Sequence, residues 1–111
     1  MNQVLLPPLP PAPKYSMLVI SSYIPAGLTS RVHHHSGVEM FYVLDGEQCL
    51  ETPTQGYPMK KGDVLILPTG LTMQMVVTGT APRRALAAVI YDAAQPSTTP
   101  TENAPPLIPC K

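Results

Sequence analysis

Short apolar runs of strand length alternate with turn signals through the middle of this chain. The apolar runs cover residues 15–24, 38–44, 48–52, 64–67, 72–77 and 85–91. Glycine and proline separate the runs, as at Pro25-Ala26-Gly27, and the Asp45-Gly46 pair between two runs is typical of a β-hairpin. The prolines and the lack of helix caps oppose long helices. So many short strands in one chain predict an all-β protein, built as an antiparallel sandwich or barrel.

The two ends of the chain differ from this middle. Residues 5–13 are dominated by proline, which has no N–H for a helix or an interior strand, so we expect an extended polyproline arm. Residues 95–109 are again rich in Pro, Ser and Thr and predict a tail. The predicted organisation is therefore an N-terminal arm (1–13), a barrel domain (14–94) and a C-terminal tail (95–111).

Composition narrows the class of protein. A chain of 111 residues forms one domain, and its 7 basic and 7 acidic residues give no basic surface for a nucleic acid. No apolar run is long enough to span a membrane. Charged residues make up 13%, about half the usual share, which favours self-association and predicts a homodimer. Many prolines and few lysines predict a secreted protein; no signal peptide is visible, and a cytoplasmic location is the alternative.

The chain has two cysteines, Cys49 and Cys110. They could pair with each other, cross-link two chains or stay as free thiols. Two cysteines do not define a disulfide framework, so the sequence leaves all three states open.

Candidate chemistry gathers in residues 27–46. His33 and His35 are two residues apart, so strand alternation places both on one face and His34 on the other. Glu39 begins the next apolar run, where it can turn toward them. Two neutral imidazoles and a carboxylate suit a first-row transition metal and leave coordination positions open. The alternative for Glu39 is an outer role, in which it orients a histidine without touching the metal.

Three further residues are candidates for contact with a substrate or oxidant. Phe41 shares the strand parity of Glu39, so we expect it to line the cavity. Arg31 lies at the predicted rim and could contact a polar substrate, or simply be solvated. Gln48 is predicted to point into the barrel, where its amide could position an oxidant as the catalytic residue or merely satisfy backbone groups.

The pattern of glycine, histidine and glutamate resembles that of the cupin superfamily, whose first motif is G(X)5HXH(X)3–4E(X)6G and whose second is G(X)5PXG(X)2H(X)3N. The first motif is matched by Gly27, His33, His35, Glu39 and Gly46, and the second in part by Gly62, Pro68 and Gly70. The resemblance covers residues 15–92. It implies a double-stranded β-helix, the cupin jelly-roll barrel of antiparallel strands, which is usually dimeric. It also implies a metal held by the two histidines and the glutamate.

The second motif departs from the family pattern at two positions. Met73 stands in place of the histidine and Val77 in place of the asparagine. Three explanations compete. Water or substrate could complete the site, the Met73 thioether could cap the metal and favour copper, or the site could be degenerate. Met73 could also simply fill core space. Copper is therefore the favoured metal, with iron, manganese, nickel and zinc as alternatives.

The resemblance implies a metal-dependent oxidoreductase. The small size, the missing histidine and the low charge resemble the compact monocopper cupins that cleave cellulose oxidatively. The specific hypothesis is oxidative cleavage of a polysaccharide such as cellulose with O2 or peroxide. The alternatives are a non-catalytic cupin module that binds a small ligand, and a small-molecule dioxygenase or isomerase. The partner is accordingly a polysaccharide or a small-molecule substrate.

Overall fold

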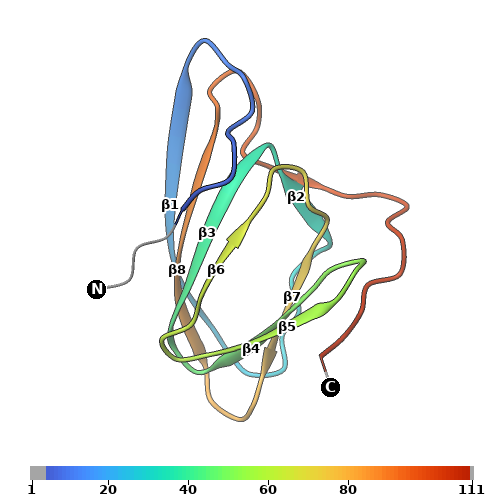
Figure 1. Cartoon of the computed structure of the whole chain (residues 1–111). Helices are drawn as coiled ribbons and strands as arrows, with labels where there is room; N and C mark the ends of the chain where they lie inside the picture. The colour runs from blue at the N-terminus through green and yellow to red at the C-terminus, as the bar shows by residue number, and fades with distance from the viewer. Residues whose placement is uncertain (1–4, 111) are drawn as a thin grey trace.

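The computed structural model describes residues 5–110, and these residues form strands and turns without a helix (Figure 1). The strands are β1 (Tyr15–Ile24), β2 (His33–His35), β3 (Gly37–Asp45), β4 (Glu47–Glu51), β5 (Gly56–Lys60), β6 (Val64–Leu67), β7 (Gln74–Thr78), β8 (Arg83–Asp92) and β9 (Thr98–Pro100). The described residues thus include no helix able to cross a membrane. The predicted all-β class is confirmed.

Two antiparallel sheets form the walls of a barrel. One has the strand order β1-β8-β3-β6 and the other β5-β4-β7. In Figure 1 the two sheets face each other, with β2 across one end. Side chains from both sheets meet between them, where Leu67 of β6 packs with Leu50 of β4 and Met75 of β7. This apolar contact between the inner faces is what joins the sheets into a jelly-roll barrel.

Strand alternation decides which side chains enter the barrel. On β8 the inward residues are buried, and the register pairs Val89 with Glu39 and Ala87 with Phe41 on β3. Directly paired residues lie on the same face of a sheet. Glu39 and Phe41 therefore both face the interior, as their parity in the sequence predicts.

The strand β5 lies between two of the apolar runs and was not among the predicted strands. β5 contains Pro58, which pairs with Cys49 of β4. Proline cannot donate to a strand ladder, and β5 tolerates it because it is an edge strand that pairs only with β4. An edge position can be recognised only from the arrangement of the whole sheet.

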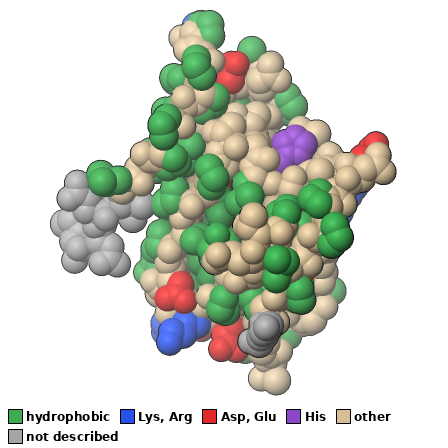
Figure 2. Space-filling model, turned by 45° about the vertical axis from the view of Figure 1, so that its right-hand side comes forward, with side chains coloured by type: hydrophobic (Ala, Val, Ile, Leu, Met, Phe, Trp, Pro, Cys, Tyr) green, Lys and Arg blue, Asp and Glu red, His purple; other side chains and the backbone are tan. Residues whose placement is uncertain are grey.

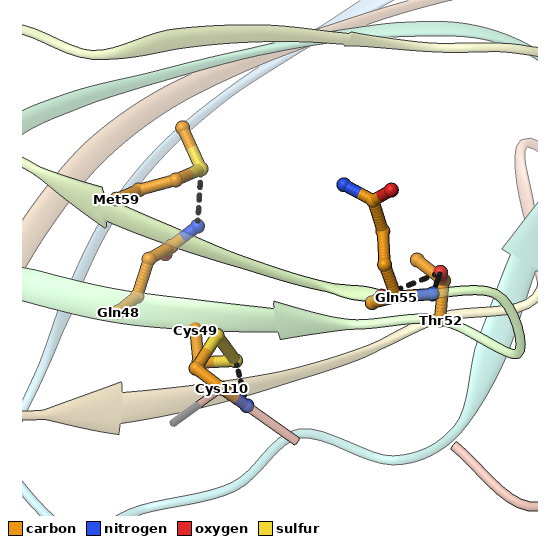
Figure 3. Close-up of a disulfide and its surroundings, with 6 residues drawn as sticks. All are labelled: Gln48, Cys49, Thr52, Gln55, Met59 and Cys110. Atoms are coloured by element: carbon orange, nitrogen blue, oxygen red, sulfur yellow. Dashed lines mark hydrogen bonds between the residues drawn. A yellow bond between two sulfur atoms is a disulfide. The ribbon is translucent and has the colours of Figure 1, made fainter. Parts of the chain in front are cut away.

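The C-terminal segment is tied to the barrel at three places. β9 pairs with β2, Ile108 forms a bridge to Thr52, and Cys110 forms a disulfide with Cys49 of β4 (Figure 3). The cysteines thus adopt the intramolecular pairing among the three states left open by the sequence. At the other end, residues 1–4 of the predicted arm lie outside the described residues, and Tyr15 donates a hydrogen bond to the Pro10 carbonyl at 2.6 Å.

Candidate metal centre

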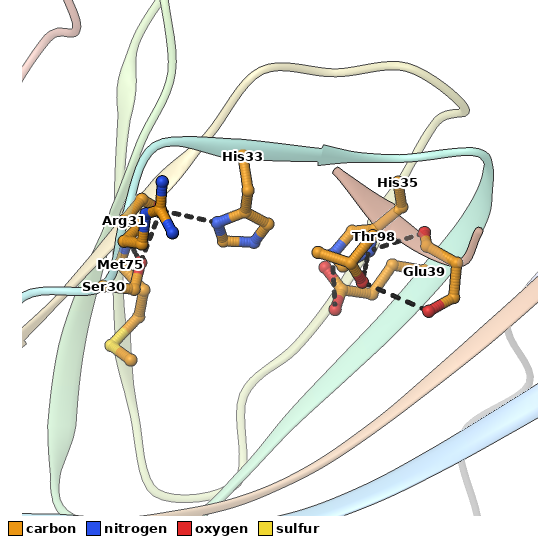
Figure 4. Close-up of polar contacts among 8 residues, drawn as sticks. Ser30, Arg31, His33, His35, Glu39, Met75 and Thr98 are labelled. Carbon is orange, nitrogen blue, oxygen red and sulfur yellow. Dashed lines mark hydrogen bonds and ion pairs between the residues drawn. The ribbon is translucent and has the colours of Figure 1, made fainter. Parts of the chain in front are cut away.

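β2 presents the first pair of candidate ligands. The rings of His33 and His35 hang from the same side of the strand (Figure 4), edge to face with 5.1 Å between their centroids. Nδ1 of His33 lies 2.7 Å from the carbonyl oxygen of Arg31. A carbonyl only accepts, so Nδ1 carries the proton and Nε2 keeps the lone pair that a metal needs.

His35 is held in the same tautomer by the C-terminal segment. Its Nδ1 lies 2.9 Å from Thr98 Oγ1 and 3.3 Å from the Ser97 carbonyl, which accepts its proton. Nε2 is therefore left as the free lone pair. Ser97 and Thr98 could not be predicted from the sequence, because they lie in a Thr-rich segment typical of a tail and no local signal connects them to β2.

Glu39 completes a buried pair with His35. Each residue is 5% exposed, and Glu39 Oε2 lies 3.2 Å from His35 Nε2. Neither Glu39 Oε1 nor His35 Nε2 makes a hydrogen bond of good geometry to any described residue. Two ligand atoms that each lie about 2.0–2.2 Å from one metal ion are about 3 Å apart. The donor set and its spacing therefore fit a shared metal ion.

Glu39 also changes the protonation of His35. Burial is the largest influence and opposes the charged ring, but the close contact with the Glu39 carboxylate and its negative charge, together with the Ser97 carbonyl, outweigh it. The pKa of His35 is consequently raised above its ordinary value. Metal binding at Nε2 competes with protonation of the same atom, and the raised pKa extends this competition to higher pH.

The three predicted ligands do not form a closed set. Within residues 5–110, no group of three or more His, Cys, Asp or Glu side chains is close enough to hold an ion together. The structure brings His35 and Glu39 into contact and places the partly exposed His33 beside them. A three-ligand site requires the His33 ring to turn toward this pair.

Met73 lies next to His33 across the ladder. The two residues exchange backbone hydrogen bonds of 2.9 and 2.8 Å, so their side chains lie on the same face. Met73 is 2% exposed and belongs to the apolar core with Leu50 and Leu67. Its packing role is therefore established by contacts, while its role as a thioether ligand stays a prediction.

Gln48 does not share this site. It pairs with Val77 on β7, four residues beyond Met73, which is about 13 Å along an extended strand. Its Nε2 donates to Met59 Sδ at 3.3 Å, and its Oε1 has no partner among the described residues (Figure 3). A pocket of about 410 Å³ that Gln48 helps to line also lies at this end of the barrel, away from His35. The position of Gln48 thus gives no support to the catalytic role predicted for it.

Arg83 is a residue that the sequence analysis overlooked. It is 1% exposed, its guanidinium lies 5.4 Å from the centre of the Phe41 ring, and its Nη1 donates to Ser22 Oγ at 2.9 Å. Burial lowers the pKa of Arg83. Arg83 shares strand parity with Ala85 and the later inward residues of β8, and this pattern predicts that its side chain faces the barrel interior. Arg31, the arginine that was predicted to bind substrate, is exposed and contacts His33 only through its carbonyl.

The fold and the site define a class: a small double-sheet barrel with a histidine–carboxylate pair inside one end. The cupin domain family (Cupin_2) matches residues 19–89, so the chain belongs to the cupin family. A comparison with curated proteins finds no match.

Several solved structures have the same fold as this chain. A Cupin 2 conserved barrel domain protein from Salinispora arenicola is 26% identical, with a TM-score of 0.62 over 70% of this chain and 65% of that one. A predicted oxalate decarboxylase from Thermotoga maritima is 28% identical, with a TM-score of 0.62 over 67% of this chain and 65% of that one. The polyketide cyclase RemF from Streptomyces resistomycificus is 17% identical, with a TM-score of 0.66 over 79% and 62%, and shows the fold alone. The chain thus spans less than two thirds of each of these structures.

Proposed function

We propose that this protein is a mononuclear metal-dependent oxidoreductase whose metal is held by His33, His35 and Glu39. One observation carries the proposal: both histidines have Nδ1 engaged with carbonyl acceptors and Nε2 left as the lone pair. An outer partner on the far ring nitrogen is the usual arrangement for a histidine that binds metal. The name of one solved relative, a predicted oxalate decarboxylase that is 28% identical, adds support for an enzyme.

We propose copper as the metal, with iron, manganese, nickel and zinc as alternatives. The pairing of Met73 with His33 on one face of the ladder supports copper, since a soft thioether favours Cu(I). A redox metal at this position would supply electron transfer to O2 or peroxide. The chain's own part is to orient the two rings through Arg31 and Ser97 and to hold Glu39 away from bulk water.

We propose a small molecule as the substrate. His35 and Glu39 are each 5% exposed, and a polymer surface requires a metal that it can reach. Oxidative cleavage of cellulose stays a prediction of the family resemblance, and no contact of the described residues favours it.

Metal loading of the protein tests this proposal. The purified chain, stripped with a chelator, is offered copper, iron, nickel, zinc and manganese separately, and bound metal is counted by mass spectrometry. We expect one ion per chain, held most tightly for copper, with a Cu(II) paramagnetic resonance signal typical of nitrogen ligands. A chain that binds none of the five metals would instead favour the non-catalytic module that binds a small ligand.

We also propose that the protein is exported and forms a homodimer. The Cys49–Cys110 disulfide supports export, because such bonds persist in oxidising compartments. The outer face of the edge strand β1 supports dimerisation: Met17, Val19 and Tyr23 are 62%, 54% and 65% exposed, and the strand has a free edge. On the face that Figure 2 shows, charged side chains are few among the described residues.

Dimerisation through β1 leads to a direct prediction. In light scattering, the wild type should have the mass of two chains, and Val19→Lys should shift it toward one chain because a lysine opposes burial of the apolar face. Thr80→Lys adds the same charge in the turn after β7 and should leave the dimer intact. A monomeric wild type, or an unchanged dimer in Val19→Lys, would contradict this interface.

A further inference from the structure

Arg83 carries a buried positive charge that the protein itself does not balance. The side chain is 1% exposed, its Nη1 bonds only to the neutral Ser22 hydroxyl, and its Nε has no partner. No carboxylate within residues 5–110 forms an ion pair with it. An uncompensated buried charge is strongly unfavourable, and arginine cannot relieve it by losing its proton. A counter-charge from outside the chain would remove this cost.

The other charged groups of the interior do not supply that counter-charge. Glu39 is the one buried carboxylate among the described residues, and it is already in contact with His35. A divalent metal at this pair would add positive charge to the same compartment. Glu39 contacts His35 and not Arg83, so no carboxylate of the described residues stands beside the guanidinium, and this local positive charge favours an anion.

The inner face beside Arg83 is apolar and partly exposed. Ile20, Ala87 and Phe41 form one row across three strands on this face. Ile20 is 38% exposed and Phe41 is partly exposed, while Ala87 between them is 6% exposed, so solvent reaches the two ends of this row. The Arg83 guanidinium extends up to the Phe41 ring. Glu39 stands in the next row, about 7 Å along the strand.

We propose that Arg83 binds the carboxylate of a small organic acid, whose apolar part lies against Phe41 and Ile20. The planar guanidinium matches a carboxylate with two parallel hydrogen bonds, and the Nε that now lacks a partner would provide one of them. One uncompensated positive charge matches a monoanion, whereas a phosphate dianion would leave excess negative charge. The apolar row favours an acid with a hydrocarbon or aromatic body.

This inference names the substrate class of the proposed enzyme. A carboxylate held at Arg83 places the remainder of the molecule one row away from the carboxylate of Glu39. Only the identification of the bound acid as a substrate rests on the proposed function, because the anion site itself requires no metal.

A titration of metal-free protein with sodium benzoate tests the anion site. Benzoate has a carboxylate and a flat apolar body, and benzyl alcohol is its neutral counterpart. Amide chemical shifts in a chloride-free buffer give the two affinities. We expect saturable binding of benzoate, at least tenfold weaker binding of benzyl alcohol, and at least a tenfold loss of benzoate affinity in Arg83→Met. Arg84→Met is the matched control, since Arg84 is the exposed neighbour on the same strand and should keep its affinity within twofold.

The outcomes separate this inference from the metal proposal. Arg83→Gln repeats the test with a neutral side chain that keeps hydrogen-bond donors, should the methionine variant fail to fold. No saturable binding of benzoate to the wild type, or unchanged affinity in the Arg83 variants, would overturn the anion site. Metal stoichiometry measured on the same variants should not change, and a failure of metal loading would overturn the metal proposal alone.

Discussion

His35→Ala is expected to abolish stoichiometric metal binding. His35 supplies an Nε2 that lies 3.2 Å from Glu39 Oε2 inside the barrel, and its loss leaves Glu39 with only the partly exposed His33 as a second proposed ligand. Loss of an outer partner alone costs about 10- to 100-fold in metal affinity, so loss of a direct ligand should cost at least about 100-fold. Copper titration followed by paramagnetic resonance measures the change.

His34→Ala is the matched control for this experiment. His34 belongs to the same strand, but its ring lies on the opposite side and its Nδ1 contacts Thr101 Oγ1 at 2.7 Å. Its removal deletes the same number of atoms without touching the proposed centre, so copper affinity should stay within about twofold. Equal losses in the two variants would indicate non-specific binding by histidine. Retention of tight copper binding in His35→Ala would rule out the proposed centre.

Removal of the disulfide is the second large expected effect. Cys49 and Cys110 are separated by 61 residues, and opening a loop of this length lowers the free energy of unfolding by about 4 kcal/mol in the chain-entropy account. The double variant Cys49→Ala/Cys110→Ala should therefore unfold at distinctly lower denaturant concentration than the wild type. Urea unfolding followed by circular dichroism measures the difference.

The wild type in reducing agent provides the control, since its stability should fall toward that of the double variant. A loss below about 1 kcal/mol would mean that the C-terminal segment is held by its other contacts, which are β9 on β2 and the bridge from Ile108 to Thr52. Metal affinity gives a second readout. Because the same segment carries Ser97 and Thr98 to His35, loosening it should weaken copper binding as well as lower stability.

Much of the fold follows from local sequence signals. Strand alternation and turn residues predict the long strands, because a side chain's face depends only on its position in its own strand. The same rule places Glu39 and Phe41 inside the barrel, and the structure agrees. The rule applies equally to Arg83, whose charge hid it from a search for apolar inward residues. β5 was missed because Pro58 is tolerated only at a sheet edge.

The candidate metal centre likewise has some features that follow from the sequence and others that depend on the tertiary structure. The sequence by itself determined the kinds of ligand, with His33 and His35 on one face and Glu39 able to reach them. Only the tertiary structure decided that His35 is oriented by Thr98, 63 residues away, that Gln48 lies about 13 Å along the barrel from the His33 row, and that Arg83 rests unpaired against Phe41. Local periodicity sets the direction of a side chain, but distances between strands depend on how the chain closes into a barrel. These distances decide which ligands and which charges meet.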